Sequence, residues 1–173
     1  MADANPMKEI RVEKITFNVG VGEAGQKLEN AKTLLNKITG KTPVTTLARI
    51  RSPTWKIKKG DPIGAKVTVR GNEAGELLKR ALQAVDQRLK PTSFDRSGNI
   101  SFGVHEYIDF PGVKYDPKIG VIGFDVCVTI SRKGGRVRSR RRFKARRIGP
   151  KHRITRDEGV AFMTEKFGVK LAE

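Results

Sequence analysis

The stretch KITFNVGV, residues 14–21, points to the fold class because apolar and polar residues alternate along it. A period of two is typical of a strand that buries one face and exposes the other. The exposed face would carry Lys14, Thr16, Asn18 and Gly20. A second alternating stretch, IGAKVTVR at residues 63–70, would expose Lys66, Thr68 and Arg70. Strands of this kind suit an antiparallel sheet covered by helices on one side only.

The segments that follow these two strands show helical periodicity. Apolar residues recur on one helical face from Gln26 until Gly40, which is a stop signal. A second helix is expected after the second strand, with Asn72 as its N-cap and Leu89 on its inner face. TRDE at residues 155–158 is a capping box that would open a C-terminal helix.

Two further strands complete the expected sheet, around residues 99–108 and 124–130, where apolar residues again alternate. We therefore expect a single α+β domain over residues 1–173. It would have two layers: a mostly antiparallel sheet with an open polar face, and helices on the other face. The hydroxyl, amide and basic groups of the open face suit the phosphates and 2′-hydroxyl groups of RNA. A basic C-terminal arm and a terminal helix would follow.

The positive charge of the chain is concentrated in two places. Lysine and arginine outnumber acidic residues 36 to 18, a formal net charge of +18. Two windows, 30–60 and 126–156, hold 8 and 13 basic residues and no acidic one, whereas the other 111 residues carry a net charge of −3. Such segregation favours two polyanion-binding segments. We expect a protruding basic loop at residues 49–62 and a basic arm at residues 131–154.

Little in the sequence points to catalysis or metal binding. The single cysteine, Cys127, excludes an internal disulfide framework and the usual cysteine metal sites, and we expect it to be a small buried thiol. His105 and His152 are the only histidines and stand far apart. No apolar run approaches transmembrane length, so a soluble intracellular protein is the default. We expect no enzyme, no cofactor and no metal.

Gly20, Gly22 and Gly25 form a G-x-G-x-x-G pattern between the first strand and the first helix, the context of a dinucleotide-binding motif. That motif needs a strand buried on both faces and an acidic residue about 20 positions on. Here the strand alternates and no acid follows, although Arg49 would suit a phosphate. The glycines are better explained by a tight turn and a shallow sheet surface. A nucleotide-dependent enzyme is the rival interpretation.

The two basic windows differ in what they offer a partner. Trp55, the only tryptophan, either anchors its loop on the core or stacks on a base or ribose, and its basic neighbours favour nucleic acid. The arm is rich in arginine, whose guanidinium binds phosphate bidentately and stacks on bases. Its GG and GP dipeptides argue against the amphipathic basic helix that a membrane would bind. A basic membrane- or DNA-associated protein is the second rival class.

Several ordered motifs closely resemble the universal large-subunit ribosomal protein five family. They are RVEKITFNVGVGEAG, TGKTPVTTLAR, DPIGAKVTVRGNEA, FDRSGNISFGVHEYIDFPGVKYDP and GPKHRIT. The resemblance runs from about residue 10 to the C-terminus, and the ending resembles the archaeal and eukaryotic branch. It implies a structural constituent of the large ribosomal subunit, in the cytoplasm, that anchors 5S rRNA in the central protuberance. The implied partners also include 23S-type rRNA, peptidyl-site tRNA, a small-subunit head protein across an intersubunit bridge, and neighbouring central-protuberance proteins.

The resemblance implies Asn18 and Thr68, at matching motif positions, as RNA contacts on the polar face. With the rest of that face and the arm, the expected rRNA-binding residues are Lys14, Thr16, Asn18, Gly20, Lys41, Lys66, Thr68, Arg70, Arg132, Arg136, Arg138, Arg140, Arg141, Arg142, Lys151, His152 and Arg153. Lys41 stands where many relatives have glutamine. The loop expected to contact tRNA supplies Arg49, Arg51, Ser52, Trp55, Lys56, Lys58 and Lys59. Its tip departs from the family pattern, so these residues follow from position only.

Overall fold

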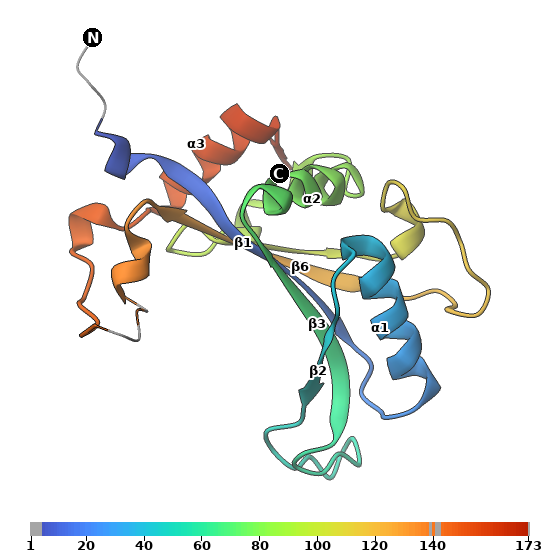
Figure 1. Cartoon of the computed structure of the whole chain (residues 1–173). Helices are drawn as coiled ribbons and strands as arrows, with labels where there is room; N and C mark the ends of the chain where they lie inside the picture. Colours follow the sequence, from blue (N-terminus) through green and yellow to red (C-terminus); the bar gives the residue numbers. More distant parts are fainter. Residues whose placement is uncertain (1–4, 139, 141–142, 173) are drawn as a thin grey trace.

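The structure is a computed structural model that describes residues 5–138, 140 and 143–172 (Figure 1). Its main sheet has the strand order β2-β3-β1-β6-β5, and all neighbouring strands are antiparallel. These strands are β1 (Ile10–Gly20), β2 (Val44–Leu47), β3 (Pro62–Arg70), β5 (Ile100–Val104) and β6 (Phe124–Arg132). The helices are α1 (Gln26–Thr39), α2 (Asn72–Gln83) and α3 (Arg156–Phe167). A short parallel pair joins β4 (Arg88–Leu89) to β7 (Lys170–Leu171).

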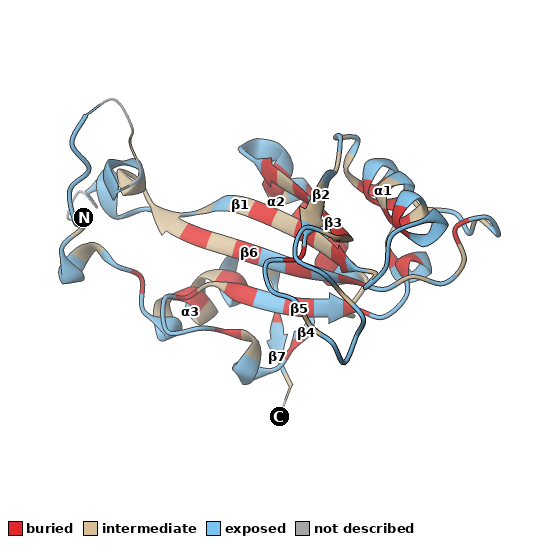
Figure 2. Ribbon diagram, turned by 90° about the horizontal axis from the view of Figure 1, so that it is seen from below, coloured by how far each residue is buried: buried red, intermediate tan, exposed pale blue. Residues whose placement is uncertain are grey.

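The alternation seen in the sequence places the core on one face of the sheet. Ile15, Phe17 and Val19 of β1 are at most 1% exposed, and buried residues alternate with exposed ones along β5 and β6 as well (Figure 2). Helices α1 and α2 supply the buried residues that cover this face. Phe17 packs edge-to-face against Phe110 and Phe124, with ring centroids 6.2 and 5.9 Å away. The expected α+β class with an antiparallel sheet is confirmed.

The antiparallel pairing of β1 contradicts the nucleotide-binding interpretation of the glycine motif. That interpretation needs a parallel sheet, whereas β1 runs antiparallel to both β3 and β6. Gly22 and Gly25 have φ angles of +81° and +129°, a region that favours glycine, and they turn the chain from β1 into α1. The motif is a strand-to-helix turn.

Helix α2 differs from the expectation at both ends. Gly71 is its N-cap and Asn72 its first helical residue, and no side chain caps it. The helix ends at Gln83, because Asp86 and Gln87 then adopt positive φ angles of 51° and 57° and reverse the chain. The expected helix reaching Leu89 was therefore wrong: Leu89 is buried but belongs to β4.

The C-terminal helix begins as its capping box predicted. The Thr155 side chain accepts from the backbone N–H of Glu158, and the Glu158 carboxylate accepts from the Thr155 backbone N–H. Met163 of α3 is fully buried, so the helix docks on the domain. Within the described residues, no helix is both long and apolar enough to span a membrane.

Candidate nucleic-acid interface

The face of the main sheet opposite the buried core is built from polar and small residues, and we call it the polar face. Its members lie on four strands: Lys14, Thr16, Asn18 and Gly20 of β1; Gly64, Lys66, Thr68 and Arg70 of β3; Asp125, Cys127 and Thr129 of β6; and Ser101 and Gly103 of β5. The register aligns Lys14 with Arg70, Thr16 with Thr68 and Asn18 with Lys66. The residues expected from the two alternating strands are thus direct neighbours.

The middle of the polar face offers hydroxyl groups at short range. The Thr16 and Thr68 Oγ1 atoms are 3.3 Å apart, within hydrogen-bond distance. Towards one end of the strands the face becomes flat, because Gly20 pairs with Gly64. A Cβ at Gly64 would lie 2.5 Å from the Val19 carbonyl oxygen, so the packing itself requires a glycine there. The surface therefore combines donors, acceptors and a shallow end that a nucleic-acid backbone can approach.

Sequence reasoning missed the contribution of β6 to this face. Asp125, Cys127 and Thr129 occupy alternate positions of β6, between the buried residues of that strand. Cys127 pairs in register with Thr16 and Ser101, and Asp125 pairs with Asn18 and Gly103. The signal was present in the sequence, because the same alternation that buries Val126 must turn its neighbours outwards.

The expectation of a buried Cys127 was wrong, because the thiol is exposed on the polar face. Its surroundings nevertheless disfavour the thiolate. Partial burial by neighbouring side chains raises the pKa of Cys127, and the negative charge of Asp125 raises it further. A raised pKa means that less thiolate is present at a given pH than in an ordinary cysteine.

We expect alkylation of Cys127 to be slower in the folded protein than in the chain unfolded in urea, at any pH below the raised pKa. Because thiolate is the reactive species, the rate of the folded protein should climb at higher pH than that of the unfolded chain. Labelling with iodoacetamide from pH 7 to 10, followed by mass spectrometry, measures both rates at this single site. Identical pH profiles for the two states would contradict the placement of Cys127 beside Asp125.

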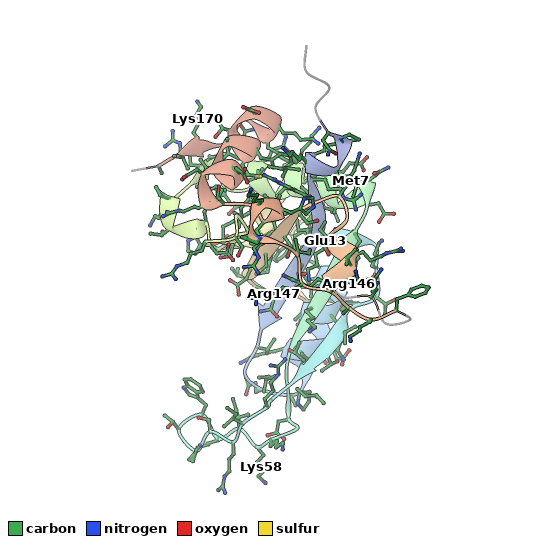
Figure 3. The ribbon with its side chains drawn as sticks, turned by 90° about the vertical axis from the view of Figure 1, so that its left-hand side faces the viewer. Met7, Glu13, Lys58, Arg146, Arg147 and Lys170 are labelled. Carbon is green, nitrogen blue, oxygen red and sulfur yellow. The ribbon has the colours of Figure 1, made fainter. Side chains whose placement is uncertain are left out.

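The second surface is the segment between β2 and β3, which we call the loop (residues 49–62). It projects beyond the sheet, and Lys58 lies near its outer end (Figure 3). Ser52 and Ile57 exchange two backbone hydrogen bonds of 2.9 and 3.0 Å, and Gly60 N–H donates to the Ala48 carbonyl at 2.9 Å. Two sets of backbone hydrogen bonds therefore close the protruding loop across its width.

Trp55 lies in the turn that the Ser52–Ile57 pair closes, and its side chain is 74% exposed. This exposure excludes the alternative in which Trp55 anchors the loop on the core. Arg49, Arg51, Lys56, Lys58 and Lys59 are exposed as well, and Ser52 is half-buried. Lys58 N–H donates to the Asp61 carboxylate at 2.7 Å. This hydrogen bond fixes the segment that leads from the loop back into β3.

The third surface is the arm (residues 131–154), in which Arg136, Arg138, Lys151 and Arg153 are exposed and Arg140 is half-buried. Figure 3 shows Arg146 and Arg147 on the same segment, which the sequence reasoning did not single out. The Arg140 guanidinium lies 5.8 Å from the ring centroid of Phe143, an aromatic side chain that is 71% exposed. Arg141 and Arg142, also expected to bind rRNA, lie outside the described residues.

The base of the arm is closed by side chains from both of its ends. Arg132 donates to the Glu158 carboxylate at 2.6 Å and to the Lys151 carbonyl at 3.4 Å, and only 10% of its side chain is exposed. His152 Nε2 donates to the Lys133 carbonyl at 2.9 Å. Arg132 and His152 therefore hold the arm at its base, and in the structure their side chains serve this contact instead of facing outwards with the other arginines.

Lys41 lies apart from these surfaces and forms an ion pair with Glu73 of α2 at 2.5 Å. Among the described residues no group of three or more histidine, cysteine or acidic side chains is arranged to hold a metal ion. The remaining expected residues separate into the polar face, the loop and the arm, which come from different parts of the chain but belong to one sheet and its extensions.

Comparison with known proteins gives one and the same family over nearly the whole chain. The family model for ribosomal protein L5 matches residues 5–58, and the model for the C-terminus of the same ribosomal family matches residues 62–162. The large ribosomal subunit protein uL5 of Sulfurisphaera tokodaii is 46% identical over 170 residues, covering 98% of this chain and 96% of the relative. Those of Nanoarchaeum equitans and Methanobrevibacter smithii are 46% and 42% identical, and the matches cover 96% and 95% of this chain and 98% and 96% of the relatives.

Proposed function

This chain belongs to the ribosomal protein L5 family, and we propose that it is a structural protein of the large ribosomal subunit that binds 5S rRNA through the polar face. Its relatives are named as large-subunit proteins, which supports a place in the cytoplasmic ribosome. The family consists of structural ribosomal proteins, so the chain is not an enzyme.

The observation that carries the proposal is the register of the polar face. Lysine, arginine, hydroxyl and amide groups stand directly opposite one another in successive pairs, from Lys14 with Arg70 to Asn18 with Lys66. Such pairs recur about every 6.8 Å along the strands, with about 4.8 Å between strands. A dense set of donors on a flat, open surface suits the phosphates and 2′-hydroxyl groups of RNA better than a small ligand.

The loop and the arm would extend the interface beyond the sheet. The exposed Trp55 and the cations around it support a contact with peptidyl-site tRNA, in which the indole stacks on a base or packs against a ribose. The arm carries exposed arginines that would bind rRNA, both the 5S rRNA on the polar face and the adjoining 23S-type rRNA. A bridge to a small-subunit head protein and contacts with neighbouring central-protuberance proteins rest on family membership alone.

The selectivity of the protein tests this function directly. We would titrate labelled 5S rRNA, tRNA and duplex DNA separately at 200 mM salt, where non-specific charge attraction is weak. Specific complexes typically exceed non-specific ones by about 10³-fold or more in affinity, so 5S rRNA should bind far more tightly than the other two. Equal affinity for duplex DNA would overturn the proposal and favour a general polyanion-binding protein.

Replacing Thr68 by valine is expected to weaken 5S rRNA binding about fivefold to tenfold. Valine keeps the shape of the side chain but removes the hydroxyl that faces the Thr16 hydroxyl, and one hydrogen bond is worth about 1 kcal/mol. Trp55→Ala is the matched control, because the loop would serve tRNA and not 5S rRNA. Electrophoretic mobility shift or fluorescence anisotropy titration measures both variants, and equal weakening would contradict the assignment of separate roles to sheet and loop.

A further inference from the structure

Asp125 is the one acidic member of the polar face and lies next to its flat end, where Gly20 pairs with Gly64. In the register it stands between Asn18 of β1 and Gly103 of β5, in the row that also contains Lys66 of β3. The other charged members of the face, Lys14, Lys66 and Arg70, are all basic. A carboxylate at this place would repel the phosphates that the rest of the face attracts, and so it calls for a specific explanation.

The carboxylate of Asp125 is exposed and unengaged within the described part of the chain. No ion pair there includes it, and no side-chain hydrogen bond reaches it. The neighbouring Gly103 places no side chain beside the carboxylate, and a Cβ there would be in ordinary contact with Asp125 Oδ1, at 3.7 Å. Asp125 therefore has free acceptor sites on a surface from which an RNA can reach them.

The chemistry of a carboxylate limits what it can bind on RNA. When ionised it only accepts hydrogen bonds, so it is repelled by phosphate and attracted by a donor. The donors that RNA presents are the ribose 2′-hydroxyl and the amino and imino N–H groups of bases. A hydrogen bond to a charged acceptor is also stronger than one between neutral groups.

We propose that Asp125 is a specificity-determining residue that accepts a hydrogen bond from a 2′-hydroxyl or a base N–H of the bound RNA; this rests on the proposed 5S rRNA function. The orientation of the RNA follows from it. Phosphates would lie over the basic column of β3, with Lys66 and Arg70, and sugars or base edges over β6. The carboxylate would then stabilise a complex in which an RNA donor lies opposite it. It would weaken the binding of any polyanion that places a phosphate there.

The test is Asp125→Asn, which keeps the shape and removes the charge on an exposed side chain. Affinity for 5S rRNA should fall about tenfold, because the hydrogen bond to a charged acceptor is replaced by a weaker one to a neutral amide oxygen. Affinity for duplex DNA should rise, by up to about fivefold, because a repulsion is removed. Glu76→Gln on α2 is the matched control, because it removes the same charge from the helix side of the sheet and should change neither affinity.

Two results would overturn the proposal. If Asp125→Asn raised the affinities for 5S rRNA and duplex DNA by the same factor, the carboxylate would be a repulsive charge only. If neither affinity changed, it would be a solvated residue outside the interface. Circular dichroism of the variant confirms that the sheet is intact. If the proposed function itself were wrong, the unmodified protein would show no preference for 5S rRNA over duplex DNA. That result is distinct from any effect of the variant.

Two further experiments identify the group on the RNA that donates the hydrogen bond. Transcripts with 2′-fluoro nucleotides lack the hydroxyl donor, so an Asp125→Asn loss that disappears with them identifies a 2′-hydroxyl, and one that persists identifies a base. Replacing Mg²⁺ by cobalt hexammine removes inner-sphere metal contacts. A loss that appears only in Mg²⁺ would overturn the direct hydrogen bond, because the carboxylate would then act through a bound cation.

Discussion

The affinity of this protein for 5S rRNA is expected to fall about 10³- to 10⁵-fold when the salt is raised from 50 to 200 mM. A fall of this size corresponds to roughly 6–10 phosphate contacts, each of which releases a counterion. The polar face and the arm together supply enough exposed cations for that number, without the loop that is assigned to tRNA. Lys41 and Arg132 contribute less, because each already pairs with a carboxylate of the chain.

The slope of log affinity against log salt concentration, taken as a magnitude, also tests the contribution of the arm separately from that of the polar face. If the arm binds rRNA, exchange of Arg146 and Arg147 for glutamine should reduce the slope by about 2, one unit for each phosphate that is no longer neutralised. The control is Lys170→Gln in β7, because Lys170 lies well away from Arg146 and Arg147 (Figure 3). It should leave the slope unchanged.

Anisotropy titrations at four or five salt concentrations give the slope for each variant. A slope of 2 or less for the unmodified protein would contradict a broad electrostatic interface, because it would leave only about two phosphate contacts. An unchanged slope after removal of both arginines would place the arm outside the RNA interface while leaving the polar face in it.

The elements that sequence predicted best are those with a local cause. The alternation at residues 14–21 and 63–70 reflects the two faces of a half-buried sheet, and β1 and β3 pair as this pattern requires. The capping box at Thr155 needs only residues within one turn of helix, and it is present. Cys127 was misassigned although its position in the alternation was available, because a general preference for buried cysteines was given more weight than the phase of β6.

The features that sequence could not reveal depend on contacts between distant residues. A register shift between Val12 and Lys14 marks a β-bulge at Glu13, and pairing with β6 produces it. The contact of Arg132 with Glu158 joins the end of β6 to the start of α3, and the local sequence around either residue does not predict it. Similarly, Trp55 is exposed in a turn that the backbone pairing of Ser52 with Ile57 closes. Each of these required the pairing partner to be known.

Replacing Gly159 by leucine is expected to destabilise the docked C-terminal helix by about 3 kcal/mol, the upper end of the cost of overpacking. Gly159 lies against Gly98, and a Cβ added to it would be 2.8 Å from Gly98 Cα and 2.9 Å from the Gly98 carbonyl oxygen. Both atoms belong to backbone, which cannot rotate away as a side chain can. The intrinsic helix preference of leucine, roughly 0.8 kcal/mol better than glycine, is too small to compensate.

Gly75→Leu provides a closely matched control. Gly75 is the fourth residue of α2, as Gly159 is of α3, but a Cβ there would meet nothing within 4 Å. The same substitution should therefore stabilise the protein, by roughly 0.5–1 kcal/mol, through helix propensity alone. Urea unfolding followed by circular dichroism compares the two variants, since the exposed Trp55 would report poorly on the core. Gly159→Ala adds a graded step if the leucine variant does not fold.

The consequence of undocking α3 distinguishes this contact from a general loss of stability. Glu158, next to Gly159, caps α3 and accepts the hydrogen bond from Arg132 that closes the base of the arm. Movement of α3 should therefore release the arm, so trypsin should cleave Gly159→Leu at the arm arginines faster than the unmodified protein, while the sheet still resists. Gly75→Leu should be cleaved as the unmodified protein is. If Gly159→Leu retained both its stability and its resistance to cleavage, the close approach of Gly98 and Gly159 would not be what holds α3 and the arm in place.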